Sequence, residues 1–245
     1  MIPTIRVASS LEDLTRQAAE RFVKSAGDAV VATGRFAVAL SGGSTPQALF
    51  TLLASDQFVH QVDWSKLHVL FSDERCVPAD HAQSNFGTAC RLLLDQVHVP
   101  YENIHRMAGE TDPKAAADEY EKILAAHYDN GLDMVLLGMG DDGHTASLFP
   151  GTEAMAATDR RCVANYVPKL SSWRLTLTAG YINRAFEVVV LVAGRSKAKM
   201  AAKVLEGMAG HPEFPIQQIS PISGRMLWLM DAEAAGMDME EDNDG

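Results

Sequence analysis

Short apolar runs alternate with longer amphipathic segments along most of the chain. Five runs of four to seven mostly apolar residues are bounded by turn-forming or charged residues, as buried strands are. A shorter run near the N-terminus can form one more strand. We therefore predict strands at residues 5–7, 36–40, 67–71, 134–137, 187–193 and 226–230.

Helical periodicity fills the intervals between these runs. After Ser9 or Ser10, which can cap a helix, apolar side chains recur at helical spacing until about Gly34. In the next interval Ser44 or Thr45 is expected to be the cap, with Pro46 in the first turn. Further helices are predicted from Ser84-Asn85, from Thr111-Asp112-Pro113, near Tyr181 and over residues 198–205.

This alternation of strands and helices predicts an α/β fold, with a mostly parallel sheet flanked by helices on both faces. Residues 161–167 and 174–178 alternate apolar and polar side chains and lie outside the main pattern, so they predict a small additional β-containing segment. No internal repeat or linker divides the chain. We expect one domain over residues 1–237, followed by an acidic, flexible tail at 238–245.

Composition and charge narrow the possible partners. The net charge is −11, and residues 231–245 carry seven acids and no base, which argues against nucleic acid as a partner. The sequence contains no apolar run of 18 residues, so it predicts no membrane-spanning helix, and no signal peptide is evident. Three irregularly spaced cysteines are typical of a reducing cytoplasm. The sequence leaves a monomer and a homodimer equally open.

Four polar segments directly follow predicted strands. They are residues 41–45, 73–75, 141–144 and 195–197. The carboxyl ends of parallel strands meet at one edge of a sheet, where ligands bind in folds of this class. We therefore expect the four segments to lie together around one site.

The most informative segment is Gly138-Met139-Gly140-Asp141-Asp142-Gly143-His144-Thr145. Three glycines within six residues allow a tight turn and a close approach of the backbone to a ligand. A plain turn needs glycine and one aspartate, but it does not need a histidine as well. We interpret His144 as a general base near neutral pH, with Asp142 orienting the ring or stabilising its charged form.

A second segment, Ser41-Gly42-Gly43-Ser44-Thr45-Pro46, precedes a predicted helix. Glycines and hydroxyls before a helix N-terminus favour the binding of an anion, although the same residues also suit an ordinary capped helix. The segment lacks the Walker, G-x-G-x-x-G and G-x-S-x-G patterns. Together with Arg75 and Lys197 it predicts a phosphate-bearing ligand.

No metal or cofactor is predicted, because neither a CxxC pair nor an HExxH motif is present. The reaction should therefore need only proton transfer and charge stabilisation. Hydrolysis of an activated carbonyl and isomerisation of a sugar both satisfy that condition.

Several of these segments, taken together, resemble the 6-phosphogluconolactonase family. The similar segments run in order along nearly the whole chain: Ser41 to Pro46, Asp73 to Pro78 with Ser84-Asn85, Gly138 to Gly151, Arg174 to Thr178, and Gly194 to Lys197. The long glycine-rich segment is highly specific, whereas each shorter segment is weak alone. The resemblance implies a Rossmann-like sheet and hydrolysis of 6-phospho-D-glucono-1,5-lactone in the pentose phosphate pathway.

The resemblance also implies roles for individual residues. His144 resembles the base that activates water, and Asp142 resembles its supporting carboxylate. The phosphate or lactone contacts would come from Gly42, Gly43, Ser44, Thr45, Arg75 and Lys197, and Arg174 resembles a further site arginine. Asp141 departs from the family pattern, which often has a non-acidic residue there. Leu170-Ser171 also departs from it, because prolines are expected after Lys169.

Two alternative functions share part of this pattern. A glucosamine-6-phosphate deaminase or isomerase has a similar glycine loop, but it usually continues with a Phe-Asn-Glu segment whose glutamate assists ring opening. This chain continues Thr145-Ala146-Ser147-Leu148-Phe149-Pro150 and has no glutamate before Glu153. A non-catalytic sugar-phosphate sensor would need a DNA-reading segment, which this acidic chain lacks before its first helix.

Overall fold

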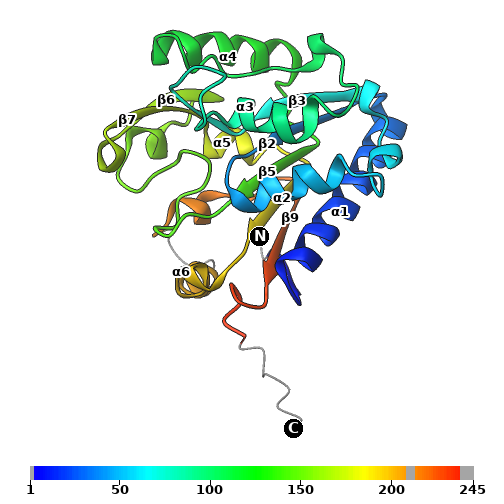
Figure 1. Ribbon diagram of the computed structural model, residues 1–245. Coiled ribbons are helices and arrows are strands. Elements are labelled where there is room, and N and C mark those ends of the chain that lie inside the picture. The colour runs from blue at the N-terminus through cyan, green and yellow to red at the C-terminus, as the bar shows by residue number, and fades with distance from the viewer. Residues whose placement is uncertain (1–2, 208–212, 238–245) are drawn as a thin grey trace.

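The computed structural model describes residues 3–207 and 213–237. Its centre is a six-stranded parallel sheet with the order β1-β9-β8-β5-β2-β3 (Figure 1). The predicted α/β fold is therefore confirmed. The strands are β1 (Thr4–Ala8), β2 (Phe36–Leu40), β3 (Leu67–Phe71), β5 (Met134–Gly138), β8 (Glu187–Val192) and β9 (Arg225–Asp231).

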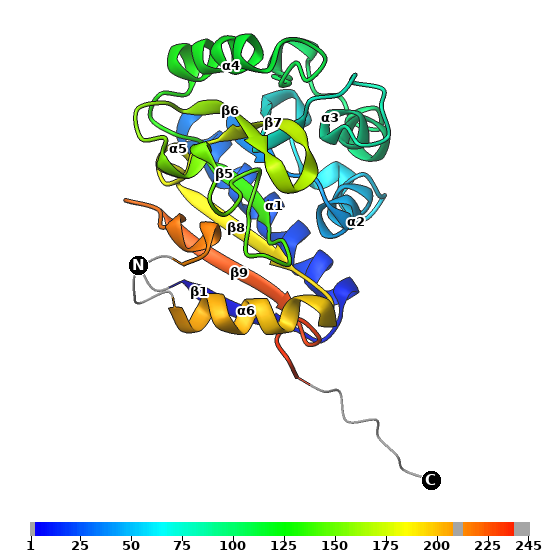
Figure 2. The same cartoon turned by 90° about the vertical axis from the view of Figure 1, so that its left-hand side faces the viewer.

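Helices cover both faces of this sheet, as Figures 1 and 2 show. One face packs against α1 (Leu11–Thr33), α2 (Ser44–Leu53) and α3 (Asn85–Ala89), which a π-helical turn at Cys90–Leu94 extends. The other face packs against α4 (Pro113–His127), α5 (Ala179–Ile182) and α6 (Arg195–Gly207). The segments 3–207 and 213–237 contain no helix that is long and apolar enough to cross a bilayer.

Strand β2 illustrates why short apolar runs become central strands. Successive side chains of a strand point to opposite faces of the sheet. Ala37 and Ala39 accordingly join the core beside α4, whereas Phe36, Val38 and Leu40 join the core beneath α1 and α2. A strand that is covered on both faces must be apolar at every position, and all five residues of β2 are buried.

A second, antiparallel sheet has the order β4-β7-β6. It consists of β4 (Asp73–Arg75), β6 (Cys162–Val167) and β7 (Ser172–Leu177). Strands β6 and β7 are the additional β segment that the alternation predicted. The polar segment 73–75, for which no strand was predicted, pairs with β7 and places Arg75 directly opposite Arg174.

The start of α2 differs from the prediction. Neither Ser44 nor Thr45 is the cap, because the helix begins at Ser44 and Gly43 is the N-cap. Gly43 has a φ of 107° and offers no side-chain hydrogen bond to the first turn. Glycine is favoured there because an L side chain is strained at positive φ. The first turn of α2 is therefore left without a side-chain cap.

The acidic tail predicted at 238–245 lies outside the described residues.

A cluster of titratable side chains lies beside β3. The hydroxyl of Tyr128 is 2.8 Å from Nδ1 of His68 and 2.8 Å from Nε2 of His105. Burial, assisted by the neighbouring His68, His127 and Arg35, lowers the pKa of His105 to about 4. The unfolded chain binds a proton at His105 more readily than the folded chain does. The free energy of unfolding therefore decreases as the pH falls from 6.5 towards 4.

Replacing His105 with glutamine should flatten this acid-dependent loss of stability, since glutamine can contact Tyr128 without titrating. Urea unfolding at pH 7, 5.5 and 4 measures the effect. His60→Gln, at an exposed position, is the matched control and should keep the wild-type slope. An unchanged slope in His105→Gln would contradict the assignment.

Candidate active site

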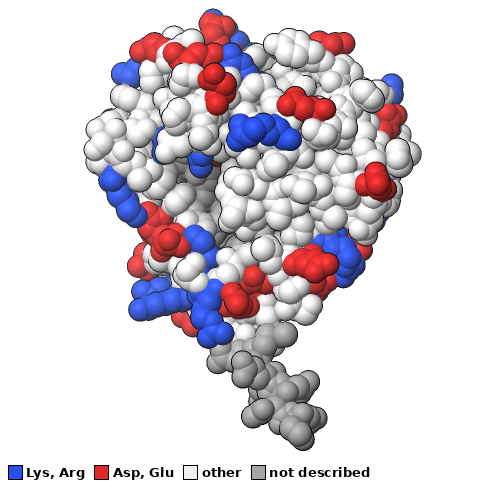
Figure 3. Space-filling view, viewed as in Figure 1, with Lys and Arg blue, Asp and Glu red and all other residues white. Residues whose placement is uncertain are grey.

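Two adjoining cavities open beyond the carboxyl ends of β2, β3, β5 and β8. The main cavity, of about 240 Å³, is lined by the segment after β2, by Arg75, by the glycine-rich segment and by Lys197. The second cavity, of about 230 Å³, shares Asp73, Arg75 and His144 with the first and adds Asp142, Lys169 and Arg174. Figure 3 shows a hollow in the surface that both basic and acidic side chains border.

The sheet topology explains this position. Strands β2 and β5 are neighbours in the sheet. From β2 the chain continues to β3, on one side of this pair, whereas from β5 it continues to β8, on the other side. The segments that follow β2 and β5 therefore diverge and leave a crevice between them. Ligands of open α/β sheets bind at such a switch point. The expectation that the four polar segments share one edge is confirmed.

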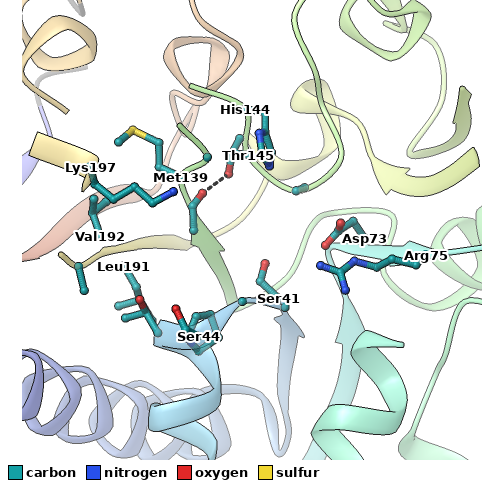
Figure 4. Close-up of a pocket in the computed structure, with 18 residues that line it drawn as sticks. Ser41, Ser44, Asp73, Arg75, Met139, His144, Thr145, Leu191, Val192 and Lys197 are labelled. Carbon is teal, nitrogen blue, oxygen red and sulfur yellow. Dashed lines mark hydrogen bonds between the residues drawn. The ribbon is translucent and has the colours of Figure 1, made fainter. Parts of the chain in front are cut away.

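The glycine-rich turn is held by its own backbone and side chains. The hydroxyl of Thr145 donates a 2.8 Å hydrogen bond to the carbonyl of Gly138 (Figure 4), and the Gly140 N–H donates to the carbonyl of His144 at 2.8 Å. A Cβ atom at Gly140 would lie 2.0 Å from the imidazole of His144. Position 140 therefore requires glycine so that the ring can occupy its place.

His144 and Asp142 form a close pair. Nδ1 of His144 is 2.5 Å from the Asp142 carboxylate, whose other oxygen accepts a 2.9 Å hydrogen bond from Lys169. Burial opposes ionisation of Asp142, but the hydrogen bonds from His144 and Lys169 outweigh it and lower its pKa to about 2. An ionised carboxylate only accepts hydrogen bonds, so Nδ1 carries a proton, and in the neutral tautomer of the ring the lone pair is on Nε2.

The imidazole is also fixed by packing. Its ring stacks on Phe149 with centroids 4.0 Å apart and an interplanar angle of 21°. No serine, threonine or cysteine side chain of the described residues is hydrogen-bonded to His144. The described contacts therefore give the ring no nucleophilic side chain to activate.

The turn after β2 presents the uncapped first turn of α2 to the main cavity. Gly42, Gly43, Ser44 and Thr45 all line that cavity. Ser41 anchors the turn, because its hydroxyl donates a 2.7 Å hydrogen bond to the carbonyl of Leu136 on β5. A helix N-terminus without a side-chain cap can satisfy its N–H groups on an anion.

Arg75 and Arg174 face each other across the small sheet without a carboxylate partner. Arg75 donates to the carbonyl of Gln83 at 2.6 Å, and Arg174 donates to the hydroxyl of Ser172 at 2.8 Å. Burial first, and then the charge of Arg75, lowers the pKa of Arg174. Two neighbouring guanidinium groups that are not held in an ion pair have the charge to attract an anion into the cleft.

The structure brings all of the predicted site residues to this cleft. His144 borders both cavities, whereas Asp142 and Arg174 line only the second. Figure 4 shows that the side chains of His144, Arg75 and Lys197 come from three separate elements around the main cavity.

Asp73 was missed by the sequence analysis. The residue is 6% exposed and lines both cavities, and its carboxylate accepts hydrogen bonds from Ser147 at 2.7 Å and from Asn85 at 3.1 Å. Its place directly after β3, in the same polar segment as Arg75, was the available signal. The ion pair between Lys169 and Asp142 had no such signal, because it depends on the path of the β6–β7 connection.

Cys76 behaves differently from what its neighbour suggests. Burial dominates and raises the pKa of the Cys76 thiol to about 11, and the opposing charge that lowers it comes from Arg174 and not from the adjacent Arg75. A thiol with that pKa is not a nucleophile at neutral pH. Within residues 3–207 and 213–237, no group of three or more His, Cys, Asp or Glu side chains is arranged to hold a metal ion.

Comparison with known proteins defines the class. The family described as glucosamine-6-phosphate isomerases/6-phosphogluconolactonase matches residues 9–228, and the chain belongs to this family. A relative from Nostoc sp., named 6-phosphogluconolactonase, is 38% identical, and the match covers 98% of this chain and 99% of the relative. The solved structure of 6-phosphogluconolactonase from Trypanosoma cruzi is 30% identical, covers 96% of each chain and has a TM-score of 0.82.

The same fold also carries a different activity. The solved structure of a monomeric glucosamine-6-phosphate deaminase is similar to this chain with a TM-score of 0.81 at 21% identity. That similarity concerns the fold alone. The choice between the activities must therefore come from the residues of the cleft.

The contact between Gly140 and His144 gives a test of this geometry. Gly140→Ala should lower kcat at least about tenfold, because a displaced base no longer meets its substrate at hydrogen-bond distance. Gly180→Ala is the matched control, since its added Cβ would meet its nearest neighbour at 4.0 Å. Steady-state kinetics of both variants, with circular dichroism to verify folding, measures the effect. Equal kcat values would refute the steric role of Gly140.

Proposed function

We propose that this protein hydrolyses 6-phospho-D-glucono-1,5-lactone to 6-phospho-D-gluconate, with His144 as the general base. The relatives that match nearly the whole chain are named for this lactonase activity. The observation that supports the residue assignment is the pairing of His144 with an ionised Asp142 in a cleft that also offers cations and an uncapped helix N-terminus.

In the proposed reaction, Nε2 of His144 removes a proton from water while the water oxygen attacks the lactone carbonyl carbon. The tetrahedral intermediate then expels the ring oxygen, which takes the proton back from the imidazolium. The bond to the ring oxygen breaks, a hydroxyl group forms, and the new carboxylic acid ionises. Asp142 stabilises the imidazolium between these two transfers and keeps Nδ1 protonated.

The remaining groups supply charge stabilisation. The negative oxygen of the intermediate needs hydrogen-bond donors that are already in place, because fixed donors need no reorganisation during the reaction. Arg75 and Arg174 border the second cavity beside His144 and suit this role. The first turn of α2 and Lys197 line the main cavity and suit the phosphate.

The cleft favours hydrolysis over the deaminase alternative. The carboxylates that line the two cavities all belong to aspartates: Asp73, Asp141 and Asp142. Glu153, the first glutamate after the glycine-rich turn, begins a 3₁₀ turn and does not line either cavity. The glutamate that a ring-opening deaminase is expected to use therefore has no counterpart among the described residues that line the two cavities.

The proposal extends to partners and location. The partner is a small phosphorylated sugar lactone, and the acidic charge of the chain argues against nucleic acid. The few, irregularly spaced cysteines favour the cytoplasm.

Removing the base tests the mechanism. His144→Ala should lower kcat by at least about 10²-fold and change KM little, since a general base contributes that much to the transition state. Acid release from freshly generated 6-phosphogluconolactone, timed against its spontaneous opening, is the measurement. A folded variant with near-normal kcat would rule out the role of His144.

Removing the lysine tests the phosphate assignment. Lys197→Ala should raise KM for the phosphorylated lactone several-fold and leave kcat less affected, because a point charge on a remote phosphate mainly contributes to binding. The same assay with unphosphorylated glucono-1,5-lactone should show no change in KM. If KM for the phosphorylated substrate stays the same, Lys197 does not belong to the phosphate site.

A further inference from the structure

The ammonium group of Lys197 has an acid partner. Its Nζ lies 2.6 Å from a carboxylate oxygen of Asp141, which is the first acid of the glycine-rich turn. The lysine side chain is 24% exposed and lines the main cavity, whereas the aspartate side chain is 75% exposed. The acid therefore approaches the lysine from the solvent side of the cleft.

The cations of the cleft fall into two groups. The described hydrogen bonds of the Arg75 and Arg174 guanidinium groups go to neutral oxygen atoms, although the carboxylate of Asp73 lines the same cavity. Lys169 is paired with Asp142, which has a separate task as the partner of His144. Asp141 forms no hydrogen bond to the imidazole among the described contacts, and its ion pair is with Lys197.

We infer that Asp141 is a resident competitor of the substrate phosphate, which must displace this carboxylate from Lys197 in order to bind. This inference rests on the proposed function, in which Lys197 contacts that phosphate. A carboxylate and a phosphate both present negatively charged oxygen acceptors to an ammonium group. Asp141 therefore determines how strongly the site prefers phosphorylated over neutral lactones.

The ion pair between Asp141 and Lys197 is weak enough for this exchange. Ion pairs with one well-exposed member contribute little to stability, because solvent screens them and long side chains lose freedom in forming them. A dianionic phosphate can therefore replace the carboxylate. The displaced Asp141 remains near the phosphate and repels it, so its charge weakens binding a second time.

A different role for Asp141 predicts the opposite result. If Asp141 positioned Lys197 for the phosphate, neutralising it would release the ammonium group and raise KM. If Asp141 competes with phosphate, neutralising it lowers KM. The direction of the change thus separates competition from positioning.

The test is Asp141→Asn, which keeps the size of the side chain and removes its charge. KM for 6-phosphogluconolactone should fall about three- to tenfold, and inorganic phosphate should become a stronger competitive inhibitor by a similar factor. KM for unphosphorylated glucono-1,5-lactone should stay the same. An unchanged or raised KM for the phosphorylated lactone would overturn the inference.

Glu119→Gln is the matched control. Glu119 forms an equally short ion pair of 2.6 Å with Lys122 on α4, where both side chains are 70% exposed and outside the cleft. This variant changes the net charge by the same amount as Asp141→Asn and should leave every kinetic constant unchanged. A fall in KM in both variants would trace the effect to net charge, which would also overturn the inference.

Binding of inorganic phosphate, measured by calorimetry, separates this inference from the proposed function. If the wild-type protein does not accelerate lactone opening, the proposed function fails. Tighter phosphate binding by Asp141→Asn, abolished by the added change Lys197→Ala, would still support the competition. Equal phosphate affinities of the wild type and Asp141→Asn would refute it, whatever the activity of the wild type.

Discussion

The hydrogen bond between Nδ1 of His144 and the Asp142 carboxylate is the constraint on which the cleft depends. It fixes the tautomer of the ring, so that one nitrogen carries a lone pair. Three neighbours maintain it: Lys169 adds to the hydrogen bond from His144 in keeping Asp142 ionised, Phe149 supports the ring, and Gly140 leaves room for it. Gly140 and Phe149 belong to the same glycine-rich segment as the pair, whereas Lys169 comes from the connection between β6 and β7, so the pair depends on how that connection packs against the segment after β5.

The parallel sheet explains how segments far apart in the sequence meet at that pair. Strands β2, β3, β5 and β8 run in the same direction, so the polar segments that follow them end at one edge. The small sheet then adds what the main sheet lacks. Its strands β4 and β7 place two guanidinium groups beside the imidazole. Like charges directly opposite each other on two strands repel, so other interactions must offset this repulsion.

Much of this arrangement was predictable from the sequence, because the strands are short apolar runs and every catalytic candidate directly follows one. The start of α2 was not, since hydroxyl side chains suggest a cap and nothing in the sequence shows that Gly43 takes that position. Strand β4 was missed because three polar residues do not resemble a strand until β7 lies beside them. Contacts such as Asp73 with Ser147, or Lys197 with Asp141, depend on the packing of separate elements.

The His68–Tyr128–His105 cluster has a consequence for any measurement made in mild acid. His68 is the second residue of β3, whereas the cleft lies beyond the opposite end of that strand. Protonation of the cluster would therefore reduce the population of folded molecules without altering the chemistry of those that remain. A pH–rate profile then combines two processes, inactivation and catalysis, and an apparent acidic limb belongs to the active site only after the folded fraction has been measured separately.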